Sequence, residues 1–85
     1  MTKVEKLKRD VIAARAALAD CRGGRVRSHA HLVRTRSDMG ASLDAIERAS
    51  ADYNAAVNRV GLAFLEVEQL QAELLEVVLA EPLKP

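Results

Sequence analysis

The feature that most limits how this chain can fold is a long run of apolar residues in its second half, spaced alternately three and four positions apart. This spacing places them on one edge of an α-helix, and its average of 3.5 residues is typical of a coiled-coil contact. The positions are Leu43, Ile46, Ser50, Tyr53, Val57, Val60, Phe64, Val67, Gln71, Leu74 and Val78, of which nine are apolar. The run therefore predicts one helix over about 42–80, roughly 58 Å long at 1.5 Å per residue, with Ser42 as its N-cap.

A second run of the same kind predicts a helix over about 3–22. Its apolar positions are Val4, Leu7, Val11, Ala14, Leu18 and Cys21. Gly23 and Gly24 follow, and glycine both lowers helix stability and tolerates the left-handed conformation that ends many helices. We therefore expect this helix to stop at the glycine pair and to cover only about half of the long helix.

The basic stretch 25–38 is ambiguous, because Val26, Ala30 and Val33 have helical spacing. It forms either a connector or short helix of its own, or a continuation into the long helix through Gly40. In the second arrangement the basic stretch lies beside the basic first helix, so like charges face each other at short range. A chain reversal near 37–42, which gives three helices, is therefore favoured.

Strand signals are missing from the sequence, and residues 3–80 lack proline. The prediction is a single all-α domain, a helical hairpin or three-helix arrangement with coiled-coil-like packing. A short tail, 81–85, closes it.

The net charge of +1 hides two oppositely charged halves. Residues 1–36 carry ten Lys/Arg against three Asp/Glu, whereas residues 37–85 carry three against nine. The first half is therefore +7 and the second −6. Such halves can neutralise each other within one chain or between two copies.

Apolar residues spread beyond one helix edge from Leu62 onward, which is typical of a helix with two or more neighbours. In so short a chain a second copy is the expected neighbour, most simply in a twofold dimer. The residues expected to carry self-association are Tyr53, Val57, Val60, Phe64, Val67, Leu70, Leu74 and Val78.

The densest polar cluster supports two interpretations. It contains the arginines Arg22, Arg25, Arg27, Arg34 and Arg36, together with His29 and His31. It is either a basic patch that binds a protein partner or a phosphate-contacting surface for nucleic acid. The stretch lacks the aromatic residues that stack on bases, and the chain is nearly neutral overall. A protein partner is therefore favoured.

Candidate chemistry is sparse. His29 and His31 lie two residues apart, so on a helix their side chains diverge and do not share a metal ion. The glycine pair lacks the Lys and Ser/Thr of a phosphate-binding loop, and acidic residues along one face of the long helix are commonplace on exposed surfaces. We expect no catalytic, cofactor-binding or metal-binding site.

Cellular context follows from the same residues. The single cysteine excludes an intramolecular disulfide, and neither a signal peptide nor an apolar run of membrane-spanning length is evident. A cytoplasmic protein without a membrane partner is expected, and the abundant Ala and Arg suggest a bacterial or phage source. The sequence thus predicts a small non-enzymatic interaction module, acting as an adaptor, a structural subunit or an inhibitor of a larger assembly.

Overall fold

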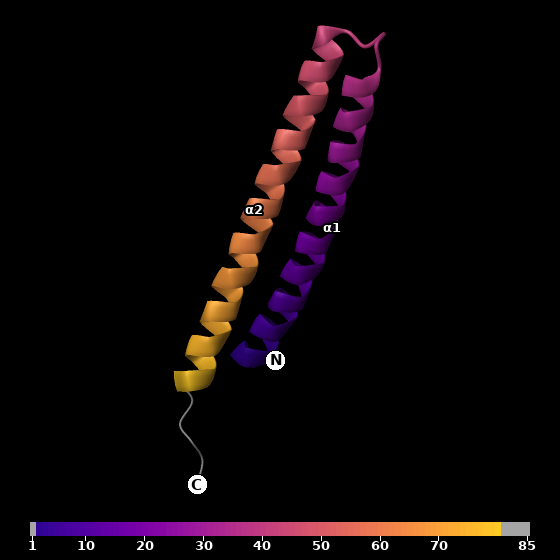
Figure 1. Cartoon of the computed structure of the whole chain (residues 1–85). Helices are drawn as coiled ribbons and strands as arrows, with labels where there is room; N and C mark the ends of the chain where they lie inside the picture. Colours follow the sequence, from indigo (N-terminus) through magenta and orange to yellow (C-terminus); the bar gives the residue numbers. More distant parts are fainter. Residues whose placement is uncertain (1, 81–85) are drawn as a thin grey trace.

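The computed structural model describes residues 2–80, which form a long antiparallel hairpin of two helices (Figure 1). Helix α1 spans Lys3–Ser37 and helix α2 spans Leu43–Ala80. A short loop joins them, so the beginning of α1 lies beside the end of α2. The all-α prediction is confirmed, and the tail 81–85 lies outside the described residues.

The prediction of three helices is wrong. Gly23 and Gly24 lie inside α1, and no glycine between residues 2 and 80 has a positive φ angle. The stretch 25–38 is therefore neither a separate helix nor part of the long one. Except for its last residue, it belongs to α1, which runs alongside α2 up to the loop instead of covering half of it.

The packing between the helices explains why the glycine pair does not end α1. Two glycines in a helix interior cost about 2 kcal/mol relative to alanine. Ending the helix there would leave four backbone carbonyls without helical partners and would detach the residues beyond. Those residues keep the same three-and-four spacing, and Leu32 among them is buried. Tertiary contact thus outweighs the local preference.

The contact between the helices is a single seam along the hairpin. On α1 it consists of Val4, Leu7, Val11, Ala14, Leu18, Cys21, Arg25, Ser28, Leu32 and Thr35, all buried or half-buried. On α2 it consists of Ile46, Ala49, Tyr53, Ala56, Val60, Ala63, Val67, Leu70, Leu74 and Val77. A buried core cluster brings Ala14 and Leu18 against Val67. Both sets keep a seven-residue repeat, as in a coiled coil.

Local hydrogen bonds define the helix ends. At the start of α1, the Glu5 N–H donates to Thr2 Oγ1 at 3.2 Å and the Thr2 N–H donates to Glu5 Oε2 at 3.4 Å, forming a capping box. In the loop the Gly40 N–H donates to Asp38 Oδ1 at 2.9 Å. The Ala45 N–H then donates to Ser42 Oγ at 3.1 Å, as expected for an N-cap. The chain reverses within the predicted stretch 37–42.

The hairpin lays helices of opposite charge side by side. Helix α1 contains ten Lys/Arg and three Asp/Glu, a net charge of +7, whereas α2 contains two Arg and seven Asp/Glu, a net charge of −5. The arrangement therefore disperses the charge of both helices along one rod.

Candidate interaction surfaces

The residues expected to carry self-association divide into two groups in the structure. Tyr53, Val60, Val67, Leu70 and Leu74 belong to the seam and are buried or half-buried. The other three, Val57, Phe64 and Val78, lie beside the seam and remain 38–47% exposed. Packing against α1 thus uses the first group, and the second group stays available to a partner.

A larger apolar surface lies on the side of α2 that points away from α1, and we name it the outer face. Its large residues are Leu62, Leu65, Leu75 and Leu79, which are between 53% and 74% exposed. They lie about half a helix turn from the seam, so α1 cannot reach them. Soluble monomers rarely leave such a row of leucines uncovered, and contiguous exposed apolar surface often marks an interaction site.

Sequence reasoning missed Gly61, which lies at the middle of this outer face. A shallow apolar hollow surrounds it, lined also by Val57, Asn58, Leu62 and Leu65. A Cβ atom built on Gly61 meets no atom within 4 Å. The hairpin itself therefore has room for a larger residue at this position. Glycine is unexpected here because it destabilises a helix interior. The available signal was an isolated glycine inside a strong helical pattern.

The predicted basic patch is mostly open to solvent. Arg22, Arg27, Arg34 and Arg36 are exposed on α1, whereas Arg25 is half-buried because it occupies a seam position. Residues 22–60, which form the loop end of the hairpin, carry seven Lys/Arg against four Asp/Glu. The basic character of this end is therefore not cancelled by the α2 residues beside it.

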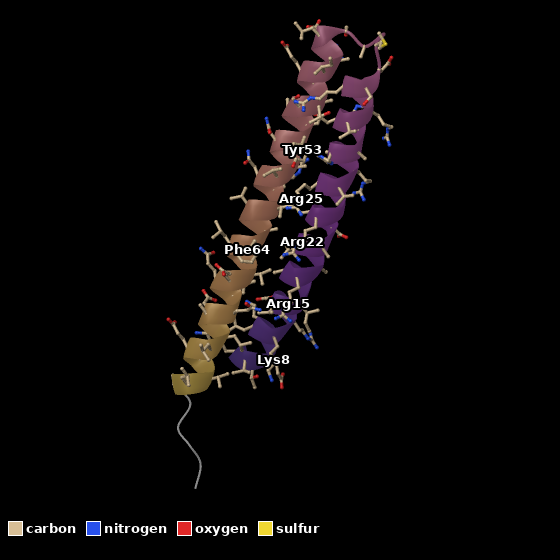
Figure 2. All side chains as sticks on the ribbon, in the orientation of Figure 1. Lys8, Arg15, Arg22, Arg25, Tyr53 and Phe64 are labelled. Atoms are coloured by element: carbon tan, nitrogen blue, oxygen red, sulfur yellow. The ribbon has the colours of Figure 1, made fainter. Side chains whose placement is uncertain are left out.

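A cationic row extends the patch toward the beginning of α1. Its cations, Lys8, Arg15, Arg22 and Arg36, lie on one seven-residue repeat whose remaining position is His29, and all five side chains are exposed. Figure 2 shows Lys8, Arg15 and Arg22 one after another along α1. Each directly follows a seam residue in the sequence, so the row borders the seam edge of α1. Sequence reasoning had not included Lys8 and Arg15, although their seven-residue spacing placed them on this edge.

Arg25 and His29 of α1 share a small apolar notch with Val26 and with Tyr53 of α2. The centroids of the His29 and Tyr53 rings lie 5.4 Å apart, and the rings are inclined by 54°. This tilted contact is within the range of favourable aromatic pairs. The ring contact joins α1 and α2 in the part of the seam where Arg25 and Ser28 replace apolar residues.

Between residues 2 and 80 no three side chains from His, Cys, Asp and Glu gather closely enough to hold a metal ion. His29 and His31 are exposed, and Cys21 is a free, half-buried thiol in the seam. No helix in this part of the chain combines the length and the apolar character needed to cross a bilayer.

Comparisons with protein-family models, curated proteins and solved structures found no match to this chain. The surfaces on the hairpin are therefore the basis for assigning a function.

Proposed function

We propose that this protein is a small non-enzymatic protein–protein interaction module that self-associates through α2. It serves as an adaptor, a structural subunit or an inhibitor of a larger assembly. The observation that carries the proposal is the outer face of α2, where Leu62, Leu65, Leu75 and Leu79 stay exposed after α1 has covered the seam. Burying each such side chain against a partner contributes about 1.5–3 kcal/mol.

The cationic row gives the module a second means of recognition. Long basic side chains at seven-residue spacing fit the acidic positions of a partner helix that lies along α1. Charged rows of this kind mainly set orientation and association rate, whereas apolar contacts supply the affinity. The module therefore combines an apolar surface on α2 with an orienting surface on α1.

A cytoplasmic location is part of this proposal. Its support is Cys21, a free thiol in a chain that holds its helices together by packing. Free thiols of this kind persist in reducing compartments.

The mass of the protein in solution tests self-association. Light scattering behind a sizing column should give twice the chain mass of 9.3 kDa at tens of micromolar. The double variant Leu65→Glu, Leu75→Glu should elute as a monomer with unchanged helix content, because both side chains are exposed in the hairpin. Ile12→Glu is the control, since Ile12 is even more exposed than Leu65 and Leu75 but lies on α1. A monodisperse 9.3 kDa wild-type protein would contradict self-association.

The role of the basic surface is tested by charge reversal. Arg27→Glu with Arg34→Glu should abolish cross-linking to an acidic partner protein in the native host while leaving the solution mass unchanged. Lys3→Glu with Lys6→Glu is the control, because these exposed cations lie at the other end of α1. Equal loss in both variants would show that overall charge, rather than this patch, determines binding.

A nucleic-acid-binding module is the second candidate, favoured by the positive net charge of residues 22–60. This function predicts binding of duplex or single-stranded DNA or RNA that weakens steeply with salt, because cations that contact phosphate release counterions. Fluorescence anisotropy with labelled oligonucleotides at about 50 mM salt tests it. Absence of any anisotropy change at that salt concentration removes this candidate.

A further inference from the structure

The geometry points to a second copy of this chain as the occupant of the outer face, with the two α2 helices antiparallel and a twofold axis passing near Gly61. The inference rests on the proposed self-association and adds the partner element, its direction and its register. Two properties of α2 support it: the position of Gly61 and the distribution of charge.

Gly61 explains the register. It lies at the middle of α2, which spans Leu43–Ala80, so an axis near Gly61 overlaps the two helices over their full length. Nothing in the hairpin occupies the space of a Cβ atom there. A second helix crossing at this point would use that space, because glycine lets two backbones approach closely. The contact with a second copy thereby explains why glycine, which destabilises a helix interior, occupies position 61.

Charge explains the direction. Residues 61–80 carry four Glu and no Lys or Arg, whereas residues 43–60 carry Arg48 and Arg59 with three acidic residues. A parallel pair would place the two acidic ends side by side. The antiparallel pair instead brings Arg48 of one copy level with Glu76 of the other, on the same flank of the contact.

The contact area is sufficient for a dimer only with full overlap. A helix of this length is about 57 Å long and at least about 10 Å wide, so complete overlap covers roughly 570 Å² on each copy. The total of about 1,100 Å² just exceeds the area of about 1,000 Å² that a specific interface needs. Half overlap would not reach it, which again places the axis at the helix centre.

Charge exchange between Arg48 and Glu76 tests the direction. In one copy the two residues are separated by roughly 42 Å along α2, so they can affect each other only between copies. Arg48→Glu should raise the dimer dissociation constant several-fold at low salt, and adding Glu76→Arg should restore it. Sedimentation equilibrium measures both. Failure of the second change to rescue the first would overturn the antiparallel register.

Cross-linking gives a second readout, in a Cys21→Ala background that removes the natural thiol. Ala51→Cys and Ala72→Cys are both exposed on the outer face and equally distant from the proposed axis. A mixture of the two variants should form a disulfide-linked heterodimer under mild oxidation, and neither variant alone should cross-link efficiently. Efficient self-linking of each variant would show a parallel dimer, which overturns this inference but leaves the proposed self-association intact.

Substitution of Gly61 tests the close approach. Gly61→Leu should raise the dissociation constant at least tenfold without lowering the unfolding temperature of the monomer, because the side chain enters open space in the hairpin. Ala16→Leu on exposed α1 is the control and should leave the dissociation constant unchanged. A dimer insensitive to Gly61→Leu would overturn the inference. A wild-type protein that stays monomeric near 1 mM would overturn the self-association as well.

Discussion

The terminal half of the hairpin, residues 2–21 with 61–80, and the loop half, residues 22–60, share one seam but fill it differently. In the terminal half the seam is aliphatic, and the buried cluster of Ala14, Leu18 and Val67 lies there. In the loop half α1 contributes Arg25, Ser28 and Thr35, and α2 contributes Tyr53 and alanines. The same seven-residue repeat thus carries two kinds of contact.

The charges of the two halves differ as well. The loop half carries a net charge of +3, from seven Lys/Arg and four Asp/Glu, whereas the terminal half carries −2, from five Lys/Arg and seven Asp/Glu. The apolar outer face is concentrated near the acidic end and the exposed arginines near the basic end. Stability and recognition are therefore distributed unevenly along the hairpin. The terminal half supplies most of the buried apolar residues, whereas the loop half exposes the arginines that are available to a partner.

The largest expected effect comes from truncating one buried leucine in each half of the hairpin. Leu18→Ala should lower the free energy of unfolding by about 3 kcal/mol, because it opens a cavity among aliphatic side chains. Leu32→Ala should cost about 2 kcal/mol, since the polar seam around it admits water more readily. Urea denaturation at one fixed protein concentration measures both. Equal losses would remove the contrast between the halves.

A second test concerns the glycine pair where the halves meet. Gly23→Ala with Gly24→Ala should raise the free energy of unfolding by about 1.5–2 kcal/mol, because alanine favours the helix. A Cβ at Gly23 would meet only the mobile end of Arg27 at 3.2 Å, and one at Gly24 meets it at 3.8 Å. Thermal unfolding followed by circular dichroism gives the result. A destabilised double variant would show that α1 needs flexibility at this point.

A third test compares the caps at the two ends of the hairpin. Ser42→Ala removes the acceptor for the Ala45 N–H and should cost about 1 kcal/mol, because the loop must be ordered for the helices to pair. Thr2→Ala removes the capping box of α1 and should cost about 0.5 kcal/mol, since that end can fray independently. Hydrogen exchange of the nearby amides distinguishes local fraying from global destabilisation.

The smallest expected effect concerns the ring contact in the loop half. His29→Ala removes the contact with Tyr53, which is worth about 0.5 kcal/mol. His31→Ala is the matched control, because His31 is exposed on the same helix and both substitutions gain the same helix propensity from alanine. The free energy of unfolding of His29→Ala should therefore lie about 0.5 kcal/mol below that of His31→Ala. Equal values in the two variants would mean that the ring pair contributes nothing.

Much of the fold could be predicted because its signals are local. The three-and-four spacing gave the helix class, and Ser42 gave the start of α2 through a hydrogen bond within one turn. The turn-forming residues Ser37, Asp38, Gly40 and Ser42 mark the stretch where the chain reverses. Each of these features depends on neighbours within a few positions and does not need a partner helix.

The candidate site could be predicted only in part. The arginines of the basic patch were recognisable as an exposed cluster, but Arg25 is half-buried because it falls on the seam. The apolar positions of α2 were recognised from the sequence. Which of them pack against α1 and which stay exposed for a partner was not. Ala49 and Ala56 are 1% exposed and fill the seam where larger neighbours such as Val57 and Phe64 had been expected.

The sequence by itself determined that the chain is helical, where it reverses and which residues carry the two opposite charges. The packing of the two helices was needed to show that α1 continues through Gly23 and Gly24 and to show which edge of α2 faces α1. Both depend on the second helix. Packing energy outweighs the local cost of two glycines, and close approach selects alanines over larger side chains at the seam. The leucines of the outer face remain exposed because α1 has only one edge with which to cover α2.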